Sequence, residues 1–374
     1  MEIKEELDKK QLEEINQKIN EISSKSLDDN ITQKINETTK QIKQRIIAKK
    51  KFMQKLREYK ELPFIQLINL KNDINSLINP ILFLFSNLEI ITEFCLGDDD
   101  DDKKEMLEQL QEGNIVKLFI QLMENMRNKN EKNPNYKQIH QLFRQDWNNN
   151  YMTQKLDDII RAILIMLEKN INIANNNLPN KYPNIITNNF ISTLVREKKC
   201  YKCGLILKIN EYPKYVIDLF LRKPEVEKNQ LQESLRSIFS NLLSGENVKQ
   251  EKCISCGELI TITKSLKNLK NYLIINLNRK YDQENLMKFV PSNPLIIFEK
   301  KENKEYKHEY ELISCLARII DDKNNNENIL RIYFKNFING KFYKTVDGKC
   351  EEFQGNIQNE VINDEPQILI YKRI

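Results

Sequence analysis

KKCYKCGL at residues 198–205 and QEKCISCGEL at residues 250–259 are two Cys-x-x-Cys pairs, each followed directly by glycine. This spacing forms a tight turn in which both sulfurs point at one centre. Two such turns can place four thiolates tetrahedrally around one Zn²⁺ ion, with no open coordination position. We therefore predict one structural zinc ion bound by Cys200, Cys203, Cys253 and Cys256.

The alternatives for these cysteines are a redox pair or chance clustering. A redox Cys-x-x-Cys needs only one pair near a βαβ pattern, whereas this chain has two pairs among its seven cysteines. The other three, Cys95, Cys315 and Cys350, lie in apolar or strand-like sequence, which predicts buried, unreactive thiols.

Length and composition fit a globular chain with two domains, or one large domain with an appendage. Of the 374 residues, 40% are hydrophobic and 30% charged, and the formal net charge is only +5, so a general polyanion-binding role is not indicated. The sequence has no apolar run of 18 residues, and its N-terminus is charged, so we expect no membrane partner and a cytoplasmic or nuclear location. Thiols stay reduced there, which favours metal over disulfide.

Residues 1–60 contain neither proline nor glycine and carry apolar residues at helical spacing. This pattern predicts amphipathic helices that can form a coiled coil. The stretch 40–60 is strongly basic, so nucleic acid or an acidic partner is one interpretation of it. A solvated helix face is the interpretation that we favour.

Helical periodicity continues to about residue 170, where the apolar run 78–88 predicts a buried helix and 156–170 an amphipathic one. The five aspartates at 98–102 lack the spacing and glycine of a calcium loop, so we expect a solvated insertion. Beyond residue 185, short β-rich runs predict a mostly antiparallel sheet, interrupted by a helix at 231–243. This is an α+β architecture.

The order of these elements resembles the ubiquitin-specific protease family, whose papain-like fold has a helical thumb, zinc-tipped β fingers and an antiparallel β palm. The two cysteine pairs look like the finger knuckles. Further segments match the family in the same order: NYLIINLNRK at 271–280, YELISCLAR at 310–318, GKFYKTVD at 340–347 and ILIYKRI at 368–374.

The resemblance implies a domain organisation. It assigns residues 62–374 to the protease-like domain, with the thumb over 62–185, the fingers over 186–270 and the palm over 271–374. Residues 1–60 then form an N-terminal helical extension.

Members of this family are cysteine proteases that release the C-terminus of ubiquitin. A cysteine at a helix N-terminus attacks, a histidine takes its proton, and an aspartate or asparagine orients the histidine. Here NLKNDINSLINPILFLF at 69–85 matches the nucleophile box, with Leu77 in place of the cysteine. Counting from GKFY puts Ile329 in place of the histidine and Val346 in place of the orienting aspartate.

No other pair of residues restores this chemistry in the sequence. The chain has two histidines, His140 and His308, and neither lies at the motif position; we expect both to be exposed. A further family box has only a faint echo at 154–164. Because triad residues act as a unit, the resemblance implies a catalytically inactive member.

Two functions remain open. The favoured one is a protein–protein scaffold or assembly subunit that binds its partner through the helices of residues 1–60. The alternative is a non-catalytic ubiquitin-binding module. An active ubiquitin hydrolase that uses an unaligned cysteine such as Cys95 is a remote third interpretation.

Overall fold

The computed structural model describes residues 47, 49–63, 74–97, 101–130, 141, 155–176, 178, 182–220, 232–235, 246–278, 288–291, 293–301, 304–320, 328–346, 349–361 and 364–374. The chain divides into two compact units, Met1–Glu61 and Leu62–Ile374.

In the first unit, residues 49–55 are helical and continue into the 3-10 turn η1 (Leu56–Glu58). The helices that we predict before residue 47 lie outside the described residues, and so does the start of the basic stretch 40–60.

The second unit begins with a helical part, which we call the thumb. Its helices are α3 (Ile74–Ser86), α4 (Glu89–Leu96), α5 (Asp101–Glu108), α6 (Ile115–Arg127), α8 (Leu156–Asn175) and α9 (Ile185–Asn189). The predicted buried helix at 78–88 is confirmed by α3, where residues such as Ile78, Ile81 and Phe85 are fully buried. The inward face predicted for 156–170 is confirmed by α8.

The start of α5 coincides with the aspartate run. Asp101 and Asp102 lie in the first turn of this helix, where carboxylates interact favourably with the helix dipole. Lys103 turns inward instead, and its ammonium donates to the Gly97 carbonyl at 2.6 Å. The run therefore continues into a helix at its described end.

No single described helix is both long and apolar enough to cross a membrane. The segments Leu77–Ser86 and Glu89–Leu96 reach the required length and composition only together, across a bend of 81°.

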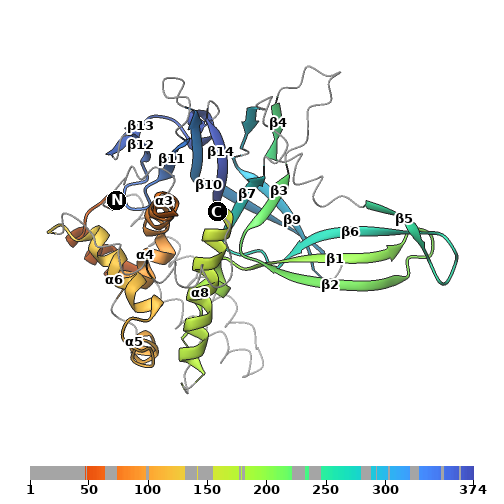
Figure 1. Ribbon diagram of the computed structural model, residues 1–374, viewed down its shortest axis with the longest axis horizontal. Coiled ribbons are helices and arrows are strands. Elements are labelled where there is room, and N and C mark those ends of the chain that lie inside the picture. Colours follow the sequence, from red (N-terminus) through yellow and green to blue (C-terminus); the bar gives the residue numbers. More distant parts are fainter. Residues whose placement is uncertain are drawn as a thin grey trace, which may run out of the picture. The chain divides into compact units, whose positions relative to one another are not determined.

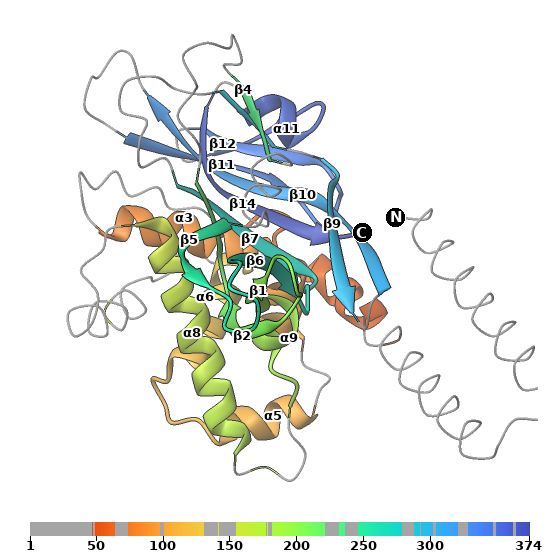
Figure 2. The ribbon, with the colours of Figure 1, turned by 90° about the vertical axis from the view of Figure 1, so that its right-hand side faces the viewer.

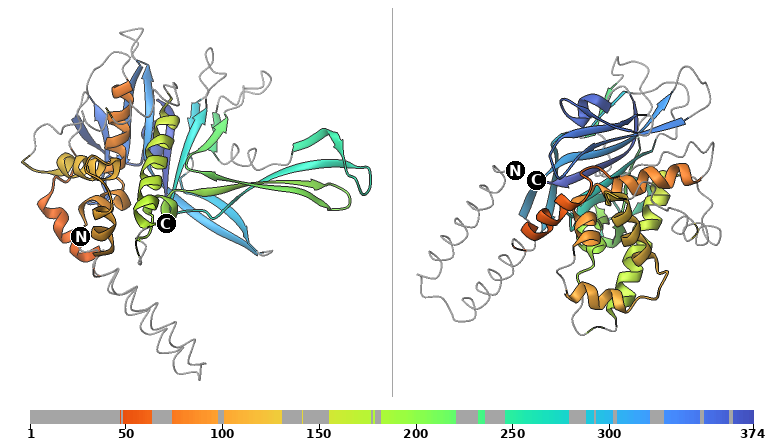
Figure 3. Two further views of the ribbon diagram at one scale, coloured as in Figure 1. Left: turned by 60° about the horizontal axis from the view of Figure 1, so that its bottom comes forward. Right: turned by 90° about the vertical axis from the view of Figure 1, so that its left-hand side faces the viewer.

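A four-stranded antiparallel sheet forms the fingers, in the order β2-β1-β6-β5. Its strands are β1 (Ser192–Cys200), β2 (Ile206–Lys214), β5 (Glu246–Lys252) and β6 (Leu259–Lys267). Figures 1 and 3 show this sheet reaching away from the other strands of the second unit, with the turns between its strands at the far end.

The palm is an eight-stranded sheet in the order β13-β12-β11-β10-β14-β7-β3, with β9 paired to β10. Its strands are β3 (Ile217–Phe220), β7 (Tyr272–Asn278), β9 (Leu295–Lys301), β10 (Lys304–Ile320), β11 (Asn328–Lys335), β12 (Phe342–Val346), β13 (Lys349–Phe353) and β14 (Glu365–Arg373). All pairings are antiparallel except that of β3 with β7. The predicted α+β class with antiparallel sheets is confirmed.

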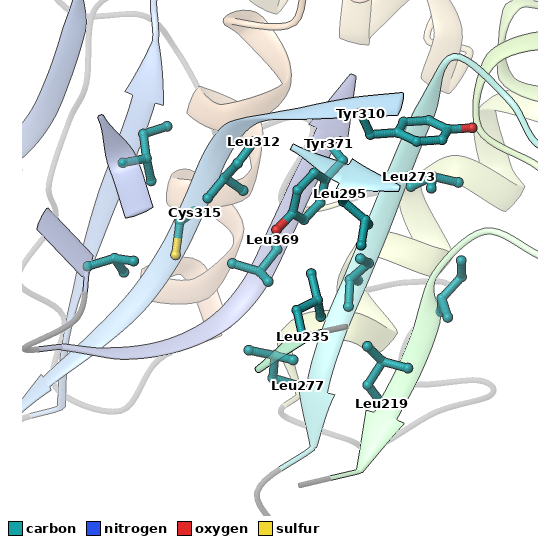
Figure 4. Packing of buried hydrophobic residues seen from close by; sticks show 14 of the residues in the cluster. Leu219, Leu235, Leu273, Leu277, Leu295, Tyr310, Leu312, Cys315, Leu369 and Tyr371 are labelled. Carbon is teal, nitrogen blue, oxygen red and sulfur yellow. The ribbon is translucent and has the colours of Figure 1, made fainter. Parts of the chain in front are cut away.

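Both faces of the palm sheet are covered. One face carries the hydrophobic cluster in Figure 4, where Cys315, Leu369 and Tyr371 lie among leucines from neighbouring strands. The short helix α11 (Ile357–Glu360) packs on this side, while the thumb helices lie on the other side (Figure 2). Strands covered on both faces carry consecutive apolar residues, as YLII at the start of β7 does.

The predicted helix at 231–243 is wrong at its start. Gln232–Ser234 form strand β4, which pairs in parallel with β8 (Lys288–Val290). The next residue, Leu235, is fully buried in the palm cluster (Figure 4). Strand pairing replaces the predicted helix at Gln232–Ser234 only, since Leu235 itself is helical. Residues 236–245 are outside the described part of the chain.

Candidate functional site

The two Cys-x-x-Cys turns at the tip of the fingers have the same backbone geometry. Gly204 and Gly257 both have φ of +72°, a conformation that glycine adopts without steric cost. The amide of Gly204 donates to the Cys200 carbonyl at 3.1 Å, and that of Gly257 donates to the Cys253 carbonyl at 2.8 Å. The glycine that follows each pair in the sequence therefore closes each knuckle.

The four sulfurs fit one zinc ion. All lie within 4.8 Å of one another. The Sγ atoms of Cys200 and Cys256 are 3.4 Å apart, and those of Cys203 and Cys253 are 3.6 Å apart. Tetrahedral Zn–S bonds of about 2.3 Å would place sulfurs about 3.8 Å apart. The predicted ligand set is therefore brought together as a site that can bind one Zn²⁺.

A backbone amide favours the thiolate form of one of these ligands, Cys200. The Cys203 amide donates to the Cys200 sulfur at 3.5 Å, and mainly this bond lowers the pKa of Cys200 to about 6. The Ser255 amide makes the matching contact to the Cys253 sulfur at 3.4 Å. Metal binding requires deprotonated thiols, so the lowered pKa of Cys200 favours it. A closed four-sulfur site would supply stability, with no position for a substrate.

The three segments that the sequence motifs assign to the triad also lie together. Leu77 is in the first turns of α3 and is half-buried. This helix packs on β11, the strand of Ile329, where Phe83 meets Phe334 edge-on at 5.3 Å between ring centroids. Strand β12, which ends at Val346, is the next strand in the sheet.

The side chain of Val346 lies on the face of β12 opposite the face that α3 covers. The Tyr343 ring stacks on Phe334 at 5.6 Å, so it shares the face that meets α3. Lys344 points the other way, and its ammonium lies 3.3 Å from the Glu360 carboxylate of α11. Side chains alternate along a strand, so Val346 lies on the α11 side.

Polar and aromatic contacts fill the α3 side of this junction. The Thr345 hydroxyl accepts a hydrogen bond from the Ile332 amide at 2.9 Å, and Thr345 is buried. This hydroxyl, Tyr343 and Phe334 are engaged in packing and backbone contacts. Of Phe334, Tyr343 and Thr345, only Tyr343 has an ionisable side chain. Its hydroxyl oxygen accepts a hydrogen bond from the Asn339 side chain at 2.9 Å.

The described thiols outside the knuckles are poor nucleophiles. Cys95 and Cys315 are buried, and burial raises the pKa of Cys95 far above its usual range. Cys350 of β13 pairs with Thr345 and is therefore close to the triad-equivalent segment. Burial raises its pKa to about 11, so it is a neutral thiol at physiological pH. The prediction of buried, unreactive thiols holds, although Cys350 is only half-buried.

His308 is not the exposed side chain that we predict from the sequence. It is 17% exposed, and its Nε2 lies 3.0 Å from a carboxylate oxygen of the buried Glu299. Both residues belong to the β9–β10 pair, before β10 meets β11. The only described histidine is thus paired away from Cys350. His140 lies outside the described residues.

The structure contains a charged cluster between the thumb and the palm that we did not predict from the sequence. Arg161 of α8 donates to Asp157 at 2.8 Å and to Asp158 at 3.4 Å, and it also contacts Asp218 of β3. Asn276 of β7 donates to the same Asp218 carboxylate at 3.1 Å. Helix α8, which contains most of the weak family match at 154–164, therefore forms an ion pair with the palm strand β3. Its partner strand is distant in sequence, so no local pattern reveals it.

Comparison with solved structures agrees with the arrangement of thumb, fingers and palm. A structure of the yeast SAGA DUB module matches with a TM-score of 0.63 at 13% identity, over 85% of this chain and 69% of that chain. A second, of the SAGA DUB module with Ubp8, Sgf11, Sus1 and Sgf73 bound to monoubiquitin, matches with a TM-score of 0.60 at 14% identity, over 86% and 70%. The chain has a ubiquitin-specific-protease fold. The resemblance seen in the sequence motifs is thus confirmed for the fold.

A third match, to the same module bound to ubiquitin aldehyde, has a TM-score of 0.59 at 14% identity, over 85% of this chain and 70% of that chain. No protein-family model and no curated protein matches the sequence. At this level of identity, backbone arrangement is shared while side chains differ at most positions.

Proposed function

We propose that this chain is a pseudo-deubiquitinase, a ubiquitin-specific-protease fold without catalytic function, which acts as a scaffold in a protein assembly. The observation that supports the proposal is the motif match in the sequence, which puts Leu77, Ile329 and Val346 at the three triad positions. None of these can attack a carbonyl, move a proton or orient an imidazole.

The surroundings of these positions support an inactive protein. The nearest described thiol on the neighbouring strand, Cys350, is kept neutral by burial, and the described histidine, His308, is paired with Glu299 in another part of the palm. A cysteine nucleophile needs a base within hydrogen-bonding reach. The remote alternative of an active hydrolase using Cys95 is opposed by the complete burial of that thiol.

The scaffold role rests on the part of the chain outside the protease-like fold. We propose that the amphipathic sequence of residues 1–60 binds a protein partner, because its apolar stripe is suited to pairing with another helix. The structurally similar SAGA module, in which Ubp8 is joined by Sgf11, Sus1 and Sgf73, is consistent with a role in an assembly. A cytoplasmic or nuclear site of action is part of this proposal.

A non-catalytic ubiquitin reader is the second candidate. The retained finger and palm sheets favour it, because a SAGA module with this fold is solved with monoubiquitin bound. In this case the globular body of ubiquitin would bind without cleavage.

Calorimetric titration of the full chain with mono-ubiquitin separates these two candidates. The scaffold predicts no binding, or binding in the millimolar range, whereas micromolar affinity would establish the reader and contradict the scaffold. The zinc content of the sample is measured in parallel, so that a loss of binding through misfolded fingers is recognised.

A further inference from the structure

Exposed apolar side chains gather along one border of the finger sheet. Five large apolar residues of the segment 201–212 are between 40% and 84% exposed, namely Tyr201, Leu205, Ile206, Ile209 and Tyr212. A single exposed hydrophobic residue is ordinary, whereas a contiguous group of them marks an interaction surface. This border is therefore the candidate interaction surface of the fingers.

Strand β2 forms this border and has an open edge. It is the first strand in the order β2-β1-β6-β5, and among the described strands it pairs only with β1. Figure 1 shows it as the lower border of the fingers. None of its nine residues is buried. An open edge with apolar side chains is a template for another strand, and proteins that stay monomeric usually protect such an edge.

The apolar side chains of β2 point to both faces of the sheet. The strand is regular from Lys208 to Tyr212, since its register against β1 shifts only at Leu207. Side chains alternate along a regular strand, so Ile209, which is 50% exposed, and Tyr212, which is 43% exposed, lie on opposite faces. A partner that docks on one face would cover only one of them. A strand added at the edge of β2 contacts both, which favours strand addition over face docking.

We propose that the added strand is β2 of a second copy of this chain, in an antiparallel pair about a two-fold axis. In such a pair every register places one residue opposite itself. An axis at Lys208 or at Glu211 would oppose like charges, which destabilises a sheet. An axis at Asn210 would bring Pro213 into the paired stretch, and proline has no amide hydrogen to donate.

An axis at Ile209 avoids each of these conflicts. It places Ile209 opposite the partner's Ile209, and Lys208 opposite the partner's Asn210, so an apolar pair lies at the centre and no like charges are opposed. The paired stretch is then 206–212, which ends before Pro213. Antiparallel pairing also places the two palms at opposite ends of the joined sheet, because the tip of one set of fingers lies beside the base of the other (Figure 1).

Analytical ultracentrifugation of the zinc-loaded full chain measures the association. We expect a monomer–dimer equilibrium with a dissociation constant on the order of 10 µM, as for a small and transient interface. Amide exchange of residues 206–212 should slow at concentrations well above this value, because the outward amides of β2 become hydrogen-bonded, while exchange in the palm strands stays unchanged. The dimer does not depend on the triad-equivalent residues or on residues 1–60.

Substitutions at the axis test the register. Ile209→Lys places two ammonium groups opposite each other and is expected to weaken dimerisation by about tenfold or more. The matched control is Ile173→Lys on α8, because Ile173 is 51% exposed and the charge change is the same; the dissociation constant should change by less than about twofold.

Ile209→Glu should weaken dimerisation as Ile209→Lys does, and an equimolar mixture of the two variants should recover dimers by pairing opposite charges. This recovery requires an axis at Ile209, since only that axis makes residue 209 its own partner. Zinc content and thermal midpoint confirm that each variant is folded.

Four results would overturn the proposal. A monomer at every concentration up to about 100 µM would leave the β2 edge to a strand from another protein. A dimer that Ile209→Lys leaves intact, or that Ile173→Lys weakens equally, would place the contact on another surface, such as residues 1–60. Failure of the mixed Ile209→Lys and Ile209→Glu chains to associate would show that residue 209 does not face itself.

Discussion

The zinc knuckles and the α3–β11–β12 junction differ in how many of the residues expected from the family motifs they retain. The knuckles have all four sulfurs, both glycines and the closing hydrogen bonds. The junction has the helix, the strands and their aromatic packing, while Leu77 and Val346 stand at the positions where we propose that reactive side chains are missing. Structure and chemistry are therefore carried by different residues of one domain.

The physical reason lies in how each region is stabilised. The knuckle tip is too small and exposed to bury a core, so its fold depends on the ligands themselves. The junction is stabilised by the Phe83–Phe334 contact and by burial on both faces of the palm sheet. The proposed loss of catalytic side chains would leave such packing intact. A complete zinc site in the sequence therefore predicts the fold but does not predict protease activity.

The largest effect is expected from loss of a zinc ligand. Cys253→Ser removes one of four thiolates, and structural zinc contributes roughly 10 kcal/mol to such sites, so the finger strands should lose their protection from hydrogen exchange while the palm keeps it. Metal analysis after dialysis should find one equivalent of zinc in the parent chain. The control is Cys350→Ser, which should leave zinc content unchanged.

Less than about half an equivalent of zinc in the parent chain would contradict four-cysteine coordination. Unfolding of the palm together with the fingers in Cys253→Ser would contradict their separate stabilisation.

The next effect concerns packing at the junction. Phe334→Ala removes a fully buried ring that touches Phe83 and Tyr343, and we expect the free energy of unfolding to fall by about 3–5 kcal/mol with zinc still bound. Urea denaturation measures this change in the free energy of unfolding. Phe298→Ala, at a half-exposed ring of β9, is the control and should cost less than about 1 kcal/mol. Equal costs for the two variants would show that the junction is loosely packed.

A smaller effect is expected at the thumb–palm tie. Burial raises the pKa of Asp157, so this carboxyl favours folding below its unfolded pKa, and that contribution is lost as pH rises through the higher folded pKa. Arg161 offsets the cost of the charged form. Arg161→Met should therefore lower the free energy of unfolding by roughly 2 kcal/mol at pH 7, and by less at pH 4.

The control for this variant is Lys104→Met, which removes an exposed partner of Asp101 and should change stability by less than about 0.5 kcal/mol at either pH. Denaturant unfolding at the two pH values measures both variants. A cost of Arg161→Met that is larger at pH 4 than at pH 7 would contradict the proposed role of Arg161.

The smallest effect is expected at Cys350. Because burial raises its pKa from 9.0 to about 11, its stabilising contribution is present below pH 9 and is lost as pH rises through 11. The difference in stability between the parent chain and Cys350→Ser should shrink over that interval. Alkylation by iodoacetamide should likewise be slow at pH 8 and accelerate above pH 10. Rapid alkylation at pH 8 would show a thiolate close to the triad-equivalent segment.

The sequence predicts the parts of this fold that follow from local pattern. Ligand spacing identifies the knuckles, helical periodicity identifies α3 and α8, and apolar runs identify the palm strands from β7 onward. The finger strand β2 is harder, because its residues are exposed or half-exposed on both faces and show no clean alternation.

Long-range contacts account for what the sequence does not reveal. The burial of His308 depends on Glu299, which is brought beside it by the β9–β10 pairing. The Arg161–Asp218 contact joins residues 57 positions apart, and the β4–β8 pairing replaces the start of an expected helix. Each is decided by a partner that the local sequence does not contain.

The central claim, that the fold is retained without its protease activity, is tested most directly by hydrolysis of a ubiquitin–fluorophore conjugate by the zinc-loaded full chain. We predict no release above that of a protein-free control, and no change on replacing Cys95 or Cys350 with serine. Turnover that is abolished by either replacement would contradict the claim and identify the nucleophile.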